Sequence, residues 1–283
     1  MKFSAIASGL ALVSSAAAAV AAPPCKRDAL PTTTVAGVEV VDTDIVRAVR
    51  DFIETYYAEY QPYLTNHLYR TWLFGAAAIN NNATLKAELD LEVHAIGTML
   101  HDMGWDIKPD SPYTTGEYVF EVDSGHFAME WVKNYTAVNG GAEDWDELRL
   151  QKINLGIMLQ TSPGYTAFTF PDSAWIAESV AFEFPQPESP LIGSENYDNI
   201  WAAYSNSTLF RGTNFTFTNM AVYKGATVYN NFISSFGEAY IPGYSTKGYT
   251  FFDLITAGLQ AEVAQYPDVD FVQKIPPGGA NPL

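Results

Sequence analysis

Residues 90–106 read Asp-Leu-Glu-Val-His-Ala-Ile-Gly-Thr-Met-Leu-His-Asp-Met-Gly-Trp-Asp, and this stretch decides the fold that we expect. The positions that recur at the 3.6-residue spacing of a helix are Leu91, Ala95, Thr98, Met99 and Asp102. Gly104 is a typical stop signal, so the stretch predicts a helix that carries His101 and Asp102 near its end. An imidazole beside a carboxylate suits zinc, iron or manganese, although one such pair is weak evidence by itself.

Helical patterns continue on both sides of this stretch. Before it we expect an extended lead-in over residues 28–42, a helix over 44–60, and a helix capped by Thr65 that ends at Asn80–Asn82. After it we expect a helix capped by Asp123 and one started by Asp144 and Glu147, and then helices over 173–184, 197–204, 221–236 and 251–265. Connections are short and no linker divides the chain. The sequence therefore predicts a single all-α domain over residues 44–265, with a tail over 266–283.

The N-terminus has the composition of a secretory signal peptide over residues 1–21. Lys2 precedes an apolar, alanine-rich run, and Ala19-Val20-Ala21 is a small-residue cleavage site. We therefore expect a secreted, extracellular protein. Lys26-Arg27 fits either a site that trims a pro-segment over residues 22–27 or an ordinary basic pair in a terminus.

Net charge and the distribution of apolar residues limit the classes of partner that we expect. The formal charge of -17 repels phosphate backbones, so we expect no nucleic acid partner. No stretch after the signal is long and apolar enough to span a bilayer, so we expect no membrane partner. The single cysteine, Cys25, excludes an intramolecular disulfide.

Four acceptor triplets for N-linked carbohydrate agree with export. They are Asn82-Ala83-Thr84, Asn134-Tyr135-Thr136, Asn206-Ser207-Thr208 and Asn214-Phe215-Thr216. Each triplet is common by chance, and only the group carries weight. Carbohydrate at these places implies a eukaryotic source and surface loops.

A third ligand from a neighbouring helix would complete a metal site with His101 and Asp102, and His67 is the candidate. Its separation from His101 suits two adjacent helices joined by a short loop. The alternative for any single histidine is a hydrogen-bonded core or surface residue. His94 fits either a residue that lines the pocket or a buried, hydrogen-bonded histidine, and we expect the second. Glu92 and Asp106 are expected to be solvated.

Two strings carry a resemblance to a known family: Asn66-His67-Leu68-Tyr69-Arg70-Thr71-Trp72-Leu73-Phe74-Gly75 and Leu100-His101-Asp102-Met103-Gly104-Trp105. They resemble the HD-domain superfamily of metal-dependent hydrolases, in particular the fungal branch related to cyanamide hydratase. Phe120-Glu121-Val122-Asp123 and Leu159-Gln160-Thr161-Ser162-Pro163 are similar to later blocks of that branch, so the resemblance covers roughly residues 44–184. It implies an all-helical fold, one divalent metal ion, and His67, His101 and Asp102 as ligands.

The chain departs from the family at two positions. Gln160 stands where the family usually has a histidine, and Glu183 stands where its last metal-binding aspartate is expected. Glutamate can still bind a cation, so Glu183 is the expected fourth ligand, and Glu183→Asp should preserve or improve binding. Gln160 is the expected catalytic neighbour, although an amide cannot titrate near neutral pH.

The resemblance implies a hydrolase or hydratase that acts on a small molecule. A metal would activate water against a C–N, nitrile-like or phosphoester substrate, with Asp102 as both ligand and proton acceptor. The alternative is a non-catalytic protein that keeps the fold, with a degenerate metal site used for binding or structure. Gln160 and Glu183 favour that alternative, whereas His67 and His101-Asp102 favour the enzyme.

Overall fold

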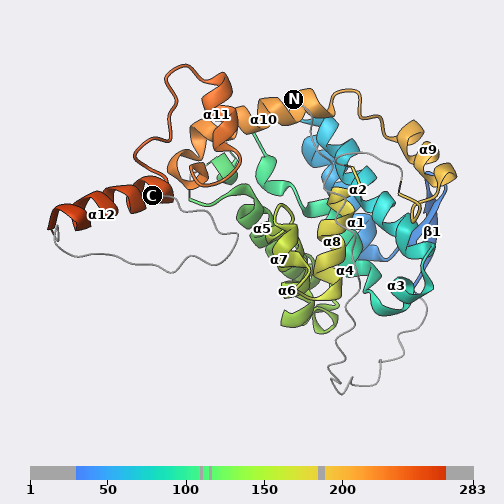
Figure 1. The fold of residues 1–283 in the computed structure, drawn as a ribbon. Helices are drawn as coiled ribbons and strands as arrows, with labels where there is room; N and C mark the ends of the chain where they lie inside the picture. Colours follow the sequence, from blue (N-terminus) through green and yellow to red (C-terminus); the bar gives the residue numbers. More distant parts are fainter. Residues whose placement is uncertain (1–29, 109–110, 115–116, 184–188, 266–283) are drawn as a thin grey trace. The chain divides into compact units, whose positions relative to one another are not determined.

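The computed structural model describes residues 30–108, 111–114, 117–183 and 189–265 (Figure 1). This part of the chain is all-α, as predicted, with one two-stranded hairpin. The expected signal peptide, the pro-segment and the tail lie outside the described residues. None of the described helices combines the length and the apolar character that crossing a bilayer requires.

The helices follow one another along the chain. They are α1 Asp44–Tyr57, α2 Pro62–Asn80, α3 Ala83–Glu88, α4 Leu91–Leu100, α5 Phe120–Asn139, α6 Glu147–Met158, α7 Pro163–Thr166, α8 Pro171–Ala181, α9 Ser194–Ala203, α10 Leu209–Tyr223, α11 Ser234–Tyr240 and α12 Phe251–Gln265. Short 3₁₀ turns, η1 Met103–Trp105, η2 Pro112–Thr114, η3 Ala142–Asp144 and η4 Gly225–Val228, join some of them.

The expected extended lead-in is a hairpin of β1 Thr32–Val35 and β2 Val38–Val41, paired antiparallel with Val35 opposite Val38. The two turn residues, Ala36 and Gly37, both have positive φ, at 48° and 82°. Such a turn matches the twist of the two strands and makes a tight connection. The buried valines of β2 rest on α2.

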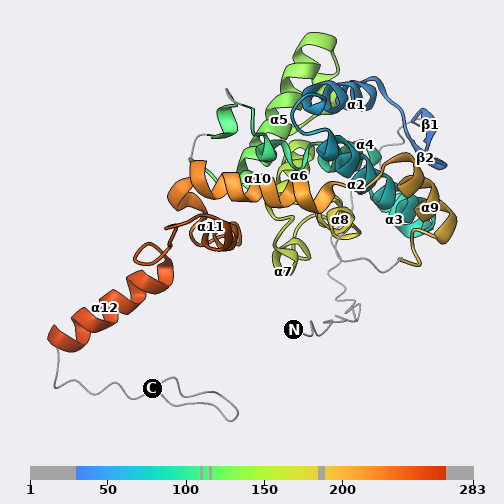
Figure 2. The same cartoon turned by 90° about the horizontal axis from the view of Figure 1, so that it is seen from above.

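The core is built around α2 and α4, which are buried along almost their whole length. α1, α2, α4 and α8 lie side by side, and α6 packs on α4 and α8 (Figures 1 and 2). A Cβ atom on Gly75 of α2 would overlap Ser179 Oγ of α8 and His94 Nε2 of α4. The absence of a side chain at Gly75 therefore allows the three helices to meet at one point.

The central helix is shorter than expected. α4 begins after Asp90, whose side chain caps it, but ends at Leu100 instead of Gly104. His101 is its C-cap, and Asp102 has left the helix with φ -115° and ψ 26°. Gly104 serves a close approach instead, because a Cβ there would overlap the backbone of Phe120 on α5.

Several other helix starts were predicted wrongly. α2 begins at Pro62 instead of Thr65, because proline fits the first turn, where its missing N–H costs nothing. α5 begins at Phe120, so Asp123 lies inside it. The N-cap of α6 is Asp146, which accepts from Arg149 N, instead of Asp144.

Most of the helix expected over residues 221–236 is not an α-helix, and the part of α10 over residues 209–220 was not predicted. α10 ends at Tyr223, and α11 starts at Ser234 after η4. Gly225 has φ 52°, a conformation that a right-handed helix excludes. The apolar spacing continues through this break, which is why the sequence pattern did not reveal it.

The acceptor asparagines do not all lie in loops. Asn82 caps α3 and Asn206 precedes α10, but Asn134 lies within α5 and Asn214 within α10. The expectation of surface loops is therefore wrong for these two. The threonines of the two helical triplets, Thr136 and Thr216, are buried.

Candidate metal centre

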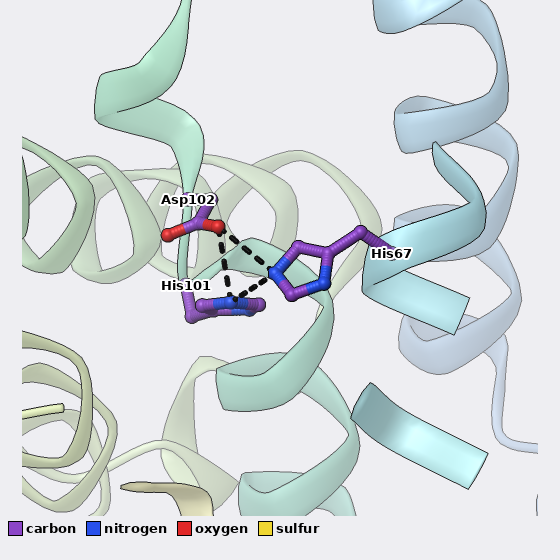
Figure 3. A group of neighbouring side chains, drawn as sticks. All are labelled: His67, His101 and Asp102. Atoms are coloured by element: carbon purple, nitrogen blue, oxygen red, sulfur yellow. Dashed lines mark hydrogen bonds and ion pairs between the residues drawn. The ribbon is translucent and has the colours of Figure 1, made fainter. Parts of the chain in front are cut away.

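Three buried side chains from two helices meet at one point (Figure 3). His67 comes from the second turn of α2, His101 from the end of α4, and Asp102 from the residue after it. His67 Nε2 lies 3.1 Å from His101 Nε2 and 3.1 Å from Asp102 Oδ2, and His101 Nε2 lies 3.2 Å from Asp102 Oδ2. None of the three is more than 1% exposed.

The outer nitrogen of each imidazole is already committed. His101 Nδ1 lies 2.8 Å from the carbonyl oxygen of Thr98, which can only accept, so Nδ1 carries the proton. His67 Nδ1 lies 2.5 Å from a carboxylate oxygen of Glu183 and donates to it. When both rings are neutral, each therefore turns an unprotonated Nε2 towards the same point as Asp102 Oδ2.

Three electron-pair donors at such short distances require a positive charge among them, from a proton or a cation. Burial opposes a charged His67, but Glu183 and Asp102 outweigh it and raise the pKa of that imidazole to about 9. Burial also favours a neutral Asp102, but His101 and His67 outweigh it and hold the pKa of the carboxyl below its ordinary value. A divalent cation would supply the same charge.

The spacing of the three atoms fits a metal ion. Ligands at about 2.1 Å from an ion lie about 3.0 Å apart when their bonds are at right angles and about 3.4 Å apart in a tetrahedron. The observed separations of 3.1 and 3.2 Å fall between these values. Histidines that donate their second N–H to a carboxylate or a carbonyl are also the usual form of metal ligand. The buried group His67, His101 and Asp102 could therefore hold a metal ion.

The structure places Glu183 against His67, but on the outer edge of the ring. Its Oε2 accepts from Nδ1, and its Oε1 accepts from Arg70 Nε at 2.6 Å. Burial raises the pKa of this carboxyl, but His67 and Arg70 together bring it below its ordinary value. Glu183 is thus not brought to the shared point as a fourth ligand, since the ring of His67 stands between, and its contact orients His67.

Arg70 follows His67 by three residues on α2, so its guanidinium reaches the same carboxylate. It also donates to the carbonyls of Tyr204 and Ser205, at 3.1 and 2.8 Å. These hydrogen bonds hold the guanidinium of Arg70 in place, and the guanidinium in turn holds the carboxylate of Glu183. The expectation for Glu183 missed this because no sequence pattern tells which edge of a histidine ring a distant carboxylate will meet.

A cavity of about 310 Å³ lies beside the group, and His67 and Asp102 form part of its wall. Gln160 also lines it, and its side-chain Nε2 donates to the carbonyl oxygen of His101 at 2.9 Å. Gln160 is therefore placed next to the candidate metal group, where it holds the backbone that presents His101.

Glu121 is a residue that the sequence did not single out for a role. It is 3% exposed, and its Oε1 accepts from the hydroxyl of Thr161, a residue of the cavity wall. Its Oε2 has no partner among the described residues. Burial raises the pKa of this carboxyl, and Asp102 adds to the effect. In the sequence Glu121 is only one residue of the string Phe120-Glu121-Val122-Asp123, and an acid there also favours a helix N-terminus, so nothing indicated a buried carboxyl.

The side chain of His94 is buried, and its Nε2 lies 3.0 Å from Ser179 Oγ. It belongs to the core, as expected. Asp106, expected in solvent, is instead fully buried and accepts from the hydroxyl of Tyr56 at 2.6 Å. Glu92, also expected to be solvated, forms an ion pair with Arg149.

Comparison with known proteins adds no assignment: no protein-family model matches this chain, and no curated protein matches it.

Proposed function

We propose that this protein is a metal-dependent hydrolase or hydratase of the HD type, which acts on a small molecule in the cavity beside His67 and Asp102. One observation carries the proposal. Three buried electron-pair donors converge on a single point at the wall of a cavity, with both imidazoles held in the form that binds a cation. The resemblance in the His67 and His101-Asp102 strings supports the reaction class.

A bound zinc, iron or manganese ion would lower the pKa of a water molecule and polarise the substrate. The protein's own residues supply the rest. Asp102 can take up a proton from the water, Glu183 and Thr98 keep both imidazoles correctly oriented, and Gln160 holds the backbone at His101. The buried setting strengthens each of these electrostatic contacts.

A non-catalytic protein with a metal used for structure is the second candidate. The amide of Gln160 favours it, because it cannot exchange a proton where the resemblance leads us to expect histidine. An enzyme predicts turnover that depends on the bound metal, whereas the second candidate predicts metal binding without turnover. A screen of C–N and ester substrates with the metal-loaded protein separates the two.

The decisive experiment measures metal binding. Purified protein is titrated with zinc, iron(II) and manganese by calorimetry, and His67→Ala, His101→Ala and Asp102→Ala are compared with His126→Ala, which removes an exposed histidine of α5. We expect one equivalent in the wild type and in the control, and at least about a 100-fold weaker affinity in the three variants. Circular dichroism confirms that each variant is folded before affinities are compared.

Negligible binding by well-folded wild type would contradict the proposal. Equal binding by the wild type and all three variants would contradict it as well, since the metal would then lie elsewhere.

A further inference from the structure

We propose that a groove along α5, apart from the candidate metal centre, binds a small organic cation with a quaternary ammonium head. The groove has a volume of about 510 Å³, and none of its wall residues belongs to the cavity beside His67. The inference therefore does not depend on the proposed function and goes beyond it.

One face of α5 forms most of the groove, because residues three and four positions apart in a helix lie on the same side. Phe127, Trp131 and Tyr135 follow one another at four-residue spacing, and the rings of Trp131 and Tyr135 stack with their planes at 7°. Tyr113 and Tyr118, from the segment before α5, add two more rings, and Tyr113 meets Phe127 edge to face. In the described part of the chain the groove is thus lined by aromatic side chains, whose ring faces carry the partial negative charge that attracts cations.

A buried lysine at the end of α10 holds the wall of the groove together. The Nζ atom of Lys224 donates to the carbonyl oxygens of Tyr113 and Tyr118, at 2.9 and 3.1 Å, and to the carboxylate of Asp123. An ammonium group has three protons, so these three acceptors use all of them. The side chain of Lys224 is not exposed, and Asp123 balances its charge. The lysine therefore fixes the backbone of both tyrosines beside α5 without presenting a positive charge to the groove.

Charge in the groove favours a cation. Asp123 and Glu130 bring carboxylates to the wall, and none of its described residues is a lysine or an arginine. Because Asp123 is balanced by Lys224, Glu130 supplies the net charge of the wall. Glu130 pairs with Lys133, but the two side chains are 64% and 43% exposed, and such pairs are weak. The chain as a whole carries a net charge of -17, which also attracts cations.

The neighbouring aromatic rings already hold one ammonium group. Lys108 Nζ lies 3.1 Å from the centre of the ring of Tyr56. The ring of Tyr56 packs against Phe52, which in turn stacks on Phe127 of the groove wall. Ring faces of this cluster therefore accept a cation. A quaternary ammonium suits a mostly aromatic wall better than a primary one, because it carries no N–H group that needs an acceptor.

The test compares choline with 3,3-dimethyl-1-butanol, which has the same shape but a carbon atom in place of the charged nitrogen. Each is titrated by calorimetry into protein without added metal and, since Asn134 lines the groove, without carbohydrate at that residue. We expect choline to bind at least about tenfold more tightly than the alcohol. Equal affinities, or no binding of choline, would overturn the inference.

Matched variants locate the bound cation. Trp131→Leu replaces a ring of the groove by an aliphatic side chain, and Glu130→Gln removes the exposed carboxylate, so the second variant should fold even if the first does not. Choline affinity should fall at least about tenfold in the first and about threefold in the second. Phe168→Leu, at a ring that is 90% exposed and outside the groove, should leave it unchanged.

Circular dichroism confirms that each variant is folded before affinities are compared. Unchanged affinity in either folded groove variant would overturn the inference. A loss of choline binding in Phe232→Leu, with none in Trp131→Leu, would place the cation in the cavity beside His67 and would overturn it as well.

Discussion

At the scale of single residues, the direction in which each imidazole is held matters more than the presence of histidine. His67 and His101 each have one nitrogen bonded to an acceptor from the protein, which leaves the other for the shared point. Glu183 supplies one of these acceptors, although the sequence led us to expect a metal ligand. The two roles predict opposite outcomes for the same substitution.

Replacement of Glu183 by aspartate should weaken metal binding about 10- to 100-fold, because the shorter side chain withdraws the carboxylate from His67 Nδ1. A fourth ligand would have given unchanged or stronger binding. Calorimetry with zinc measures the affinity, and Glu178→Asp, on the exposed side of α8, is the control. Binding by Glu183→Asp as tight as that of the wild type would show that Glu183 does not orient His67 as we infer.

His94 gives the fold a dependence on pH. Burial lowers the pKa of this imidazole to about 3, whereas an unfolded histidine titrates near 6.5. The unfolded chain therefore binds the extra proton first, and stability is lost as the pH falls from about 6.5 towards 3. The contribution is about 2 kcal/mol between pH 7 and pH 5.

His94→Asn should remove this part of the pH dependence, since asparagine does not titrate. Urea unfolding of both proteins at pH 7 and pH 5 gives the two free energies of unfolding. The wild type should lose more stability than the variant between these values. An identical loss would show that His94 is not the group responsible.

The sequence located His67, His101 and Asp102 because ligand type and helix spacing are local properties. It could not place Glu183 or Asp106, because their partners, His67 and Tyr56, lie far away in the chain. Glu121 escaped notice for a related reason, since only the fold reveals that its carboxyl is buried with one oxygen unpartnered.

At the scale of elements, the start of α4 is fixed more firmly than its end. Asp90 caps the helix by accepting from the backbone N–H groups of Glu92 and Val93. The same carboxylate receives two bonds from Arg149 of α6, at 2.8 and 2.9 Å. One side chain therefore both starts the helix that leads to His101 and ties it to its neighbour.

Asp90→Ala should lower the free energy of unfolding by about 3 kcal/mol, because it removes a cap and leaves a nearly buried arginine without its main partner. Asp146→Ala is the control: it removes the cap of α6 alone and should cost about 1 kcal/mol. Denaturant unfolding measures both. Equal losses would mean that the contact with Arg149 adds nothing.

The long helices of the core were predictable, whereas α3, α7, most of α10 and the helix ends were not. Apolar spacing marked α1, α2, α4 and α8, because each buries one face or more. It did not mark the break at Gly225, where only the backbone conformation changes. The apolar spacing also predicted that α4 continues to Gly104. The helix in fact ends at Leu100, so that Asp102 lies outside it and can turn towards the two histidines.

At the scale of the whole molecule, the candidate metal group joins α2 to the end of α4, two helices at the centre of the core. A metal ion would bind there only to the folded chain, because the unfolded chain does not hold these side chains together. The all-α fold was expected from the sequence. The cavity beside the group was not, because its walls come from α8, α10 and segments far apart in the chain.

Metal removal should therefore lower the thermal unfolding temperature. At a free metal concentration of 100 times the dissociation constant, binding adds about 2.7 kcal/mol to the stability of the folded state. Calorimetric scans with and without a chelator should differ for the wild type and coincide for His101→Ala. The same unfolding temperature in both scans of the metal-loaded wild type would contradict a metal bound between the helices.

Burial of the threonines in the two helical acceptor triplets implies an order in which glycosylation and folding must occur. Thr216 is fully buried, and its hydroxyl lies 2.7 Å from that of Tyr63. A glycosyltransferase therefore cannot reach the acceptor triplet at Asn214 once α10 has packed. Thr136 is likewise buried within α5, and its hydroxyl donates to the carbonyl of Val132. In a cell that exports this chain, carbohydrate at Asn134 or Asn214 would have to be attached before these helices form. Carbohydrate found at either asparagine would therefore show that the glycosyltransferase modified the chain before α5 or α10 had folded.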